Sequence, residues 1–274
     1  MLKWLTGRAR HQTSPADGPD NRRPHPPARL LSRLPARVPA GCRVYAIGDI
    51  HGRRDLLNQL HQAITADAAT APARRILIHL GDLVDRGPDS RGVIDSLLRP
   101  LAGFETVNLK GNHEDLLLRF LDDPAMGAMW LANGGRETLL SYGVTASGTE
   151  DAAGLLRCQL AFRERLSTPH LSFLRQLAIS HSEGDYHFVH AGVRPGVPLD
   201  AQSDDDALWI RQAFLSSDVD FGRIVVHGHS VTPTPDVHHN RIGIDTGAYA
   251  TGTLTALVLE GAERRFLATG DMRS

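Results

Sequence analysis

The sequence predicts an α/β fold whose functional site lies at the carboxyl ends of parallel strands. Two observations lead to this prediction. A strand, a loop and a helix follow one another three times between residues 43 and 120. Each of these strands is followed by a cluster of Asp, His or Asn beside glycine. We therefore expect parallel strands joined by crossover helices, with the polar clusters meeting at one edge of a sheet.

The first unit begins with an apolar run at residues 43–47, which predicts a short strand. The segment GDIHG at positions 48–52 follows it directly. Asp49 and His51 are two residues apart, and in an extended segment such side chains point to the same side. Beyond this loop, apolar residues at helical spacing predict a helix: Leu56, Leu57, Leu60 and Ile64.

The second and third units repeat this pattern. A strand expected at residues 74–80 leads into GDLVDRG at 81–87 and then into a helix. That helix begins near Pro88, and its buried side is expected to hold Val93, Ile94, Leu97 and Leu98. A third strand at 104–109 ends at GNHE, residues 111–114, and a leucine-rich helix follows.

The middle of the chain, about residues 123–180, reads as mostly helical. We expect it to form a cap or a side layer, and not a separate domain. The last third returns to strand-like runs, and the turns between several of them favour a second, largely antiparallel sheet. The expected strands are 186–190, 223–226, 241–244 and 253–259.

Composition limits the class of protein. The 274 residues and a hydrophobic fraction of 41% suit one domain with a substantial core. Residues 1–40 hold eight Lys or Arg, two Asp and seven of the 16 prolines, which predicts a disordered tail before a domain over residues 41–274. The formal net charge of -1 gives no general attraction to nucleic acid or membrane. No apolar run is long enough to cross a bilayer.

The two cysteines, Cys42 and Cys158, are far apart and do not make a disulfide framework. We expect buried free thiols and a cytoplasmic location. A metal site in this chain therefore has to be built from oxygen and nitrogen ligands.

Five strand–loop junctions each offer side chains that bind dications and stand beside glycine. The candidate ligands are Asp49, His51, Asp82, Asn112, His190 and His229. Each alone has an ordinary structural explanation, such as a hydrogen-bonded turn or a satisfied core histidine. Their coincidence at five junctions favours a metal site. His227 lies two residues before His229, so one of them could be the ligand and the other a supporting residue.

Two metal ions would suit phosphate chemistry. A carboxylate such as Asp82 can bridge two ions roughly 3.5–4 Å apart, and such ions acidify a bridging water and neutralise a phosphate. Nitrogen and oxygen ligands suit Mn, Fe, Zn or Ni. The sequence therefore predicts a metal-dependent phosphoesterase.

These motifs resemble the series found in the phosphoprotein phosphatase family of the calcineurin-like metallophosphoesterases. The motifs are GDIHG (48–52), GDLVDRG (81–87), GNHE (111–114), VHAG (189–192) and GHS (228–230). The resemblance spans roughly residues 43–260. Bacterial serine/threonine protein phosphatases are the most similar members, also in the segments 133–135 and 244–247.

The resemblance implies a calcineurin-like metallophosphoesterase sandwich of two mixed β-sheets flanked by helices, and manganese as the metal. It implies two ions that share Asp82, one held by Asp49, His51 and Asp82 and the other by Asp82, Asn112, His190 and His229. His113 corresponds to a general acid and Asp85 to the carboxylate that orients it. Arg86 corresponds to a phosphate-binding arginine, with Asn112 beside it, and Arg211 is a weaker match.

Three functions follow as hypotheses. The first is hydrolysis of phosphoserine or phosphothreonine in proteins, and the second is hydrolysis of dinucleoside polyphosphates as a bis(5'-nucleosyl)-tetraphosphatase. The third is a binding protein on an inactive fold, which is disfavoured because no expected ligand is missing. The partner would be a phosphorylated protein or a small phosphoester.

Asp85 favours the first hypothesis. Symmetrical dinucleoside tetraphosphatases resemble this chain in the first motif, but they characteristically carry a small residue where Asp85 stands and usually Asp where Glu114 stands. A serine or threonine alkoxide is very basic and needs a proton as its bond to phosphorus breaks. A phosphate leaving group needs one much less.

Overall fold

The computed structural model describes residues 35–149 and 151–270. Most of the predicted tail, positions 1–34, lies outside the described residues. The described chain opens with a segment that packs on the domain. The Val38 side chain is buried, and its amide donates a hydrogen bond to the carbonyl of Gly261 at 3.0 Å.

The first sheet combines the first three strands of the domain with its last two. In spatial order the strands are β10 (Glu263–Ala268), β9 (Thr255–Glu260), β1 (Cys42–Ile47), β2 (Arg74–His79) and β3 (Glu105–Asn108). The neighbours β1, β2 and β3 are parallel, as the three repeated units predict. β9 is antiparallel to β1 and β10 is antiparallel to β9, so the strand expected at 253–259 belongs to this sheet.

The second sheet has five strands from the later part of the chain. Their order is β4 (Ser180–Glu183), β5 (Tyr186–Val189), β6 (Ile224–His227), β8 (Arg241–Gly243) and β7 (Asp236–Val237). The expectation of a largely antiparallel sheet is wrong. β5, β6 and β8 are parallel, and only the outer strands β4 and β7 pair in the antiparallel sense. The segments between β5, β6 and β8 are long enough to cross over, which a tight turn is not.

The two sheets pack face to face around an apolar core. Side chains alternate along each strand, so Val44 and Ala46 face this core while Tyr45 and Ile47 face the other side of the sheet. The same core contains Ile76, Ile78, Tyr186, Phe188, Val226, Ile242, Leu257 and Leu259. The expected sandwich of two mixed sheets flanked by helices is confirmed.

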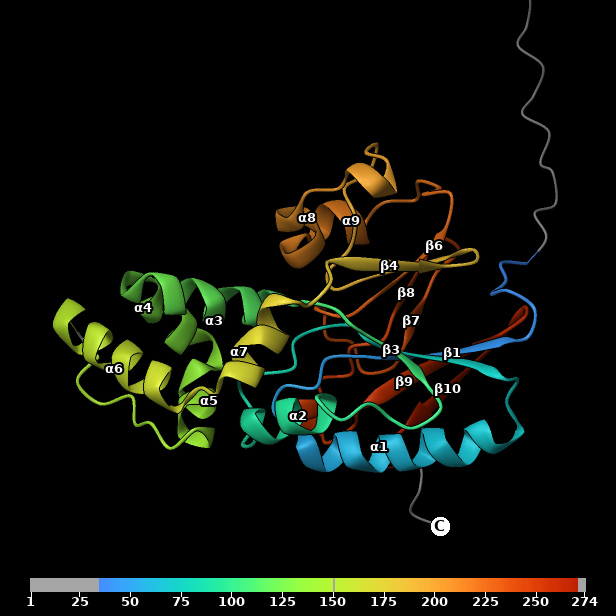
Figure 1. Cartoon of the computed structure of the whole chain (residues 1–274). Coiled ribbons are helices and arrows are strands. Elements are labelled where there is room, and N and C mark those ends of the chain that lie inside the picture. The colour runs from blue at the N-terminus through green and yellow to red at the C-terminus, as the bar shows by residue number, and fades with distance from the viewer. Residues whose placement is uncertain (1–34, 150, 271–274) are drawn as a thin grey trace, which may run out of the picture. The chain divides into compact units, whose positions relative to one another are not determined.

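Helices cover the outer faces of both sheets. The outer face of the first sheet shares one core with helices α1 (Arg54–Asp67), α2 (Ser90–Leu97), α3 (Asn112–Asp122), α5 (Arg136–Ser141), α6 (Ala152–Arg165) and α7 (Thr168–Arg175). In Figure 1, helices α3 to α7 gather beside one end of the sheets and α1 lies along the first sheet. The second sheet is covered by α8 (Asp204–Trp209) and α9 (Gln212–Leu215).

Short helices complete the chain. They are η1 (Ala68–Thr70), η2 (Pro124–Met126), α4 (Gly127–Trp130), the π-helical turn η3 (Leu131–Gly135), η4 (Leu199–Ala201) and α10 (Ala248–Thr251). The predicted helical side layer over residues 123–180 corresponds to η2 through α7. Within the described ranges, every helix is too short or too polar to span a membrane. Cys42 and Cys158 are buried free thiols, as expected.

Candidate metal centre

The loop after β1 places Asp49 and His51 in the interior. Nδ1 of His51 lies 2.9 Å from the carbonyl oxygen of Val84. A carbonyl only accepts hydrogen bonds, so Nδ1 carries the proton and Nε2 keeps its lone pair. That Nε2 faces the carboxylate of Asp82 at 3.5 Å. The carboxylate of Asp49 accepts hydrogen bonds from the backbone amide of His229 at 3.2 and 3.1 Å.

Asp82, which follows β2, lies at the centre of the site. Its Oδ2 is 3.5 Å from Nε2 of His51 and 3.8 Å from Nε2 of His113, and its Oδ1 is 3.3 Å from Nε2 of His190. Burial raises the pKa of Asp82, but His190, His113 and His51 outweigh burial and hold that pKa well below its usual range. Asp82 is therefore an anion that faces three imidazole rings.

His190 and Asn112 meet beside Asp82. Nδ1 of His190 lies 3.0 Å from the carbonyl oxygen of Leu80, so this nitrogen is the protonated one. Its Nε2 faces Oδ1 of Asn112 at 2.9 Å and Oδ1 of Asp82 at 3.3 Å. Burial lowers the pKa of His190, which favours the neutral form of the ring. A lone pair and two acceptor oxygens thus converge on one point, an arrangement that suits a cation.

The loop after β6 brings His229 to the same centre. Nε2 of His229 is buried and has no hydrogen-bond partner among the described residues. Glycine beside these residues is required for close approach. A Cβ on Gly228 would lie 2.0 Å from Oδ1 of Asp49, and a Cβ on Gly111 would lie 2.1 Å from Oδ1 of Asp82. The glycines that flank the motifs therefore leave room for the carboxylates themselves.

Two groups of ligand atoms form from these residues, and both contain Asp82. One consists of His51, Asp82 and His113, the other of Asp82, His190 and His229, and within each group the ligand atoms lie within 4.8 Å of one another. Three facts fit a pair of dications that share Asp82: the donors are carboxylate and imidazole, their lone pairs converge, and Nε2 of His229 has no other partner.

His113 differs from the other histidines of the site. Its Nδ1 lies 2.7 Å from Oδ2 of Asp85, a carboxylate, whereas Nδ1 of His51 and Nδ1 of His190 each donate to a backbone carbonyl. Burial lowers the pKa of His113, but Asp82 and Asp85 outweigh it and raise that pKa. Burial lowers the pKa of His51 to about 3. His113 is thus the one of these three histidines whose Nδ1 faces a carboxylate, and its pKa is shifted in the opposite direction from those of His51 and His190.

Asp85 is held by residues that the sequence did not single out. Oδ1 accepts a hydrogen bond from the hydroxyl of Thr138 at 2.6 Å, and Oδ2 accepts one from Nε1 of Trp130 at 3.0 Å. Burial raises the pKa of Asp85, while His113, Thr138 and Trp130 favour its charged form. These partners lie 45 and 53 residues along the chain from Asp85, so local spacing gave no signal of them.

Two arginines reach the site in different ways. The guanidinium of Arg86 lies over the ring of Tyr249, 4.9 Å from its centre, and Nη1 is 3.0 Å from Nε2 of His51. Arg211 donates from Nη1 to the backbone carbonyl of His229 at 3.3 Å. Arg86 therefore contacts a candidate ligand side chain, whereas the hydrogen bond of Arg211 goes to the backbone of another.

Glu114 has a role that its place in the sequence did not reveal. It lies in the first turn of α3, where a negative charge is favourable to the helix dipole. Its buried carboxylate also accepts hydrogen bonds, at 2.7 to 3.1 Å, from four backbone amides, those of Asp82, Leu83, Val84 and Gly111. Burial and the nearby Asp82 raise the pKa of Glu114 to about 7, and the amides favour its charged form. Glu114 thereby joins the loop after β2 to α3.

Asp245 was also missed as an individual residue. Its carboxyl group is buried and hydrogen-bonded to Asp49, and its Oδ1 accepts from the amide of Gly247 at 2.9 Å. Burial raises the pKa of Asp49, and Asp245 and Asp82 raise it further. The sequence signal was the resemblance of segment 244–247 to bacterial phosphatases, without a role for the carboxylate.

His227 lies away from the centre. Its ring packs edge-on against Phe214, with 5.0 Å between ring centres, and its Nδ1 donates to the carbonyl of Gly228 at 3.1 Å. It belongs to neither group of ligand atoms. Of the two neighbouring histidines, His229 is the one that faces Asp82.

Backbone strain is concentrated in this site. Among the described residues, five non-glycine residues have positive φ: His51 (46°), Asp82 (48°), Asp85 (71°), Arg86 (66°) and His229 (61°). Each such residue costs of order 1–3 kcal/mol and persists only where its surroundings hold it. All five are predicted site residues, so the folded structure stabilises a strained arrangement at the predicted position.

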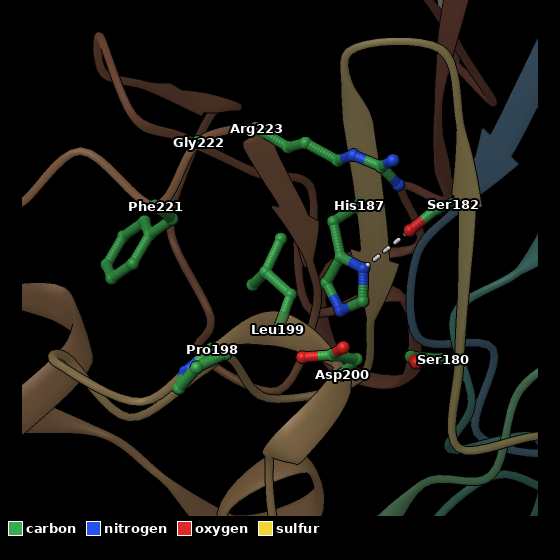
Figure 2. Close-up of a pocket in the computed structure, with 9 residues that line it drawn as sticks. All are labelled: Ser180, Ser182, His187, Pro198, Leu199, Asp200, Phe221, Gly222 and Arg223. Carbon is green, nitrogen blue, oxygen red and sulfur yellow. Dashed lines mark hydrogen bonds between the residues drawn. The ribbon is translucent and has the colours of Figure 1, made fainter.

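A separate groove lies on the outer side of the second sheet. It has a volume of about 580 Å³ and is lined by Ser180, Ser182, His187, Pro198, Leu199, Asp200, Phe221, Gly222 and Arg223. Figure 2 shows His187 on the groove wall, with its Nδ1 bonded to the hydroxyl of Ser182 at 2.9 Å. None of its lining residues belongs to the metal-binding candidates, so this groove is separate from the chemical centre.

Among known proteins, the chain is similar to two kinds of phosphatase. The chain is 28% identical over 221 residues to serine/threonine-protein phosphatase 2 of Escherichia coli, covering 77% of this chain and 90% of that one. It is 29% identical over 233 residues to the asymmetrical bis(5'-nucleosyl)-tetraphosphatase PrpE of Anoxybacillus flavithermus, covering 77% and 88%. Their names point to different substrates.

The fold and a family profile agree with these matches. The crystal structure of a candidate diadenosine tetraphosphatase superposes with a TM-score of 0.56 at 22% identity, covering 86% of this chain and 98% of that one. This likeness concerns the fold. The sequence profile of the calcineurin-like phosphoesterases matches residues 42–251, which include every strand-end cluster described above. The chain therefore belongs to the calcineurin-like phosphoesterase family and is a metallophosphoesterase.

Proposed function

We propose that this protein hydrolyses phosphoserine and phosphothreonine monoesters in proteins. The observation that supports this most directly is the buried pair of His113 and Asp85, 2.7 Å apart. A protonated imidazole beside the phosphate can give its proton to a departing alkoxide, the leaving group that most needs one. The carboxylate of Asp85 favours that protonated form.

The same proposal assigns the metal ligands. One ion would be held by Asp49, His51 and Asp82, and the other by Asp82, Asn112, His190 and His229. When bound, two such ions lower the pKa of a water molecule and neutralise phosphate charge. Manganese is our first choice of metal, and iron, zinc or nickel fit the same donors.

His113 is a second candidate for the first ion, because its Nε2 lies within the group formed with His51 and Asp82. We assign it instead to proton transfer. A ligand needs a lone pair on Nε2, and His51 and His190 have one because their protons are on Nδ1, facing carbonyl oxygens. The carboxylate partner of His113 favours a proton on both of its nitrogens.

The remaining residues bind and orient the substrate. Arg86 presents a planar guanidinium that can donate two parallel hydrogen bonds to phosphate oxygens, and its stacking on Tyr249 limits its rotation. Asn112 lies next to His113 at the start of α3, and we assign its side chain to the same phosphate. Arg211 is the weakest of these assignments, because its guanidinium donates its hydrogen bond to the backbone carbonyl of His229.

Hydrolysis of dinucleoside polyphosphates remains the second candidate. It is supported by the relatives that bear that name and by the shared fold. The two functions differ in the basicity of the leaving group. A phosphate leaving group needs little protonation, so a carefully held His–Asp pair contributes less to its departure.

A direct comparison of substrates tests the proposal. With defined Mn²⁺, kcat/KM is measured on a panel of phosphoserine and phosphothreonine peptides and on diadenosine tetraphosphate. We expect the higher values on the phosphopeptides. We also expect Asp85→Ala to reduce phosphopeptide turnover more than dinucleotide turnover. A strong preference of the unaltered protein for the dinucleotide would replace the first function with the second.

A further inference from the structure

We propose that residues 130–138, here called the clamp segment, position the two consecutive site residues Asp85 and Arg86. Within it, Thr138 and Trp130 act through Asp85, and Gly134 acts through Arg86. The inference rests on the proposed roles of Asp85 and Arg86 in the site. It assigns a specific task in the reaction to the helical layer, which provides none of the candidate metal ligands.

Gly134 contacts Arg86 closely enough to determine its position. The carbonyl of Gly134 accepts a hydrogen bond from the amide of Arg86 at 3.1 Å. A Cβ at Gly134 would lie 2.7 Å from Cγ and 2.8 Å from the backbone nitrogen of Arg86. Gly134 also has a φ of 102°, a conformation that glycine adopts without strain. Any side chain at Gly134 would therefore displace Arg86.

Thr138 contacts Asp85 on both its backbone and its carboxylate. Its hydroxyl donates to Oδ1 of Asp85 at 2.6 Å and accepts from the amide of Asp85 at 2.9 Å. Trp130 donates from Nε1 to Oδ2 of the same carboxylate at 3.0 Å. These donors leave Oδ2 oriented toward Nδ1 of His113. Thr138 and Trp130 thus fix the carboxylate of Asp85, which in turn orients His113.

The clamp segment is itself fixed by the helical core. The indole of Trp130 is fully buried and stacks on Phe120 with 4.9 Å between ring centres, and it lies 5.7 Å from the ring of Phe162. A Cβ on Gly135 would lie 2.5 Å from the indole. The segment also contains the π-helical turn Leu131–Gly135, a type of turn that is frequent at functional sites. Packing in α3 and α6 therefore extends to the site through this segment.

The two halves of the clamp segment should have different kinetic effects. Loss of the Gly134 contact displaces a phosphate-binding arginine, so it should raise KM and lower kcat/KM on every phosphate ester. Loss of the Thr138 hydroxyl affects proton donation, so it should lower kcat most on esters with basic leaving groups. A segment with only a structural role would lower activity on all substrates in proportion to the loss of folded protein.

The first experiment compares Gly134→Ala with Gly143→Ala on p-nitrophenyl phosphate with Mn²⁺. Gly143 also has positive φ, 75°, but a Cβ there meets nothing within 4 Å, so it is a control for backbone strain. We expect Gly134→Ala to lower kcat/KM about tenfold or more, the range of one charge-assisted hydrogen bond, and Gly143→Ala to leave it near the original value. In an Arg86→Ala background, Gly134→Ala should have little further effect.

The second experiment compares Thr138→Val with Thr138→Ser. Valine keeps the shape without the hydroxyl, and serine keeps the hydroxyl. We expect Thr138→Val to lower kcat on phenyl phosphate more than on p-nitrophenyl phosphate, whose leaving group is the more acidic. Thr138→Ser should restore most of the loss. Because neither change enlarges a side chain, this pair also tests the proposal if Gly134→Ala does not fold.

Specific outcomes would contradict the proposed role of the clamp segment. If the effects of Gly134→Ala and Arg86→Ala are multiplicative in the double variant, Gly134 does not act through Arg86. If Thr138→Val lowers kcat equally on both esters, or if serine does not restore it, Thr138 does not act through Asp85. A preference for diadenosine tetraphosphate would refute only the proposed substrate, because both experiments use simple phosphate esters.

Discussion

At the scale of single residues, the partner of each histidine determines what that histidine can do. His51 and His190 donate from Nδ1 to the carbonyl oxygens of Val84 and Leu80, which leaves a lone pair on Nε2. His113 instead contacts a carboxylate. One side-chain type thus provides candidate metal ligands and a candidate acid in the same site, because the partner atoms differ.

Asp82 is the residue whose change should have the largest effect. Asp82→Asn keeps the shape of the side chain but removes the negative charge that faces three imidazoles. We expect nearly complete loss of phosphatase activity and a lower content of bound metal by elemental analysis. Asp205→Asn, on α8 and exposed, provides a control. A variant with unchanged turnover and two bound ions would show that Asp82 does not bridge them.

His113 should matter for turnover and not for metal content. His113→Asn removes the proposed acid, so kcat should fall by about 10²–10⁴, the usual contribution of general acid catalysis. The loss should shrink as the leaving group becomes more acidic, since such groups depart without a proton. Turnover on a series of aryl phosphates and metal content are the two measurements. Loss of one ion in this variant would favour a ligand role.

At the scale of elements, strand ends and helix starts are joined by buried polar contacts. Glu114, in the first turn of α3, accepts amide hydrogen bonds from the loop after β2. On the outer side of β2, Nε2 of His79 lies 3.2 Å from Nε2 of His61 on α1, and Nδ1 of His79 lies 2.8 Å from Oδ1 of Asn108 on β3. Two neutral rings can form both of these hydrogen bonds, with Nε2 of His61 donating to Nε2 of His79 and Nδ1 of His79 donating to Asn108.

The histidine contact between α1 and β2 should make stability depend on pH. Burial lowers the pKa of His61 to about 4 and that of His79 to about 3. The unfolded chain binds protons at these rings near pH 6.5, and the folded chain does so only at lower pH. This contribution to stability is therefore complete above pH 6.5 and is lost as the pH falls through about 4 for His61 and about 3 for His79.

Denaturant unfolding at several pH values measures this dependence. We expect the free energy of unfolding to decrease between pH 7 and pH 5. His61→Gln removes one of the two titrating histidines. The free energy of unfolding of this variant should therefore change less steeply with pH, and the difference in slope corresponds to up to about one proton bound on unfolding. Other buried histidines also contribute to the pH dependence of stability. The slope for His61→Gln is therefore compared with the slope for the unaltered protein. Identical slopes would show that His61 is not held neutral in the fold.

At the scale of the whole molecule, the domain boundary can be tested by truncation. Residues 1–34 are rich in Arg and Pro, and the sequence predicts that they lie outside the folded domain. We expect their removal to leave Tm and activity on p-nitrophenyl phosphate nearly unchanged. Removal of residues 1–40 also deletes the buried Val38 and its hydrogen bond to Gly261, so it should lower Tm. A large loss on the shorter truncation would show that residues 1–34 contribute to the fold, whereas a loss confined to the longer one would move the domain boundary predicted at residue 41 toward residue 35.

The direction in which strands pair in the second sheet is a feature that the sequence pattern did not predict. Alternation and run length correctly predicted strands at 186–190, 223–226 and 241–244, but the turn signals between them suggested antiparallel pairing. The structure pairs β5, β6 and β8 in parallel. Local sequence indicates that a segment is extended, whereas its neighbour and direction depend on packing between segments that are distant in the chain.

The sequence by itself determined the three repeated units, the position of the site at the strand ends and the candidate ligands from Asp49 to His229. These features follow from short-range rules, namely the two-residue and 3.6-residue periods and glycine at tight loops. Only the tertiary structure decided that His227 lies away from Asp82, and that Trp130, Gly134 and Thr138 contact Asp85 and Arg86. Those contacts join residues about 45 or more positions apart, and only the packing of the helical layer beside the strand ends brings them together.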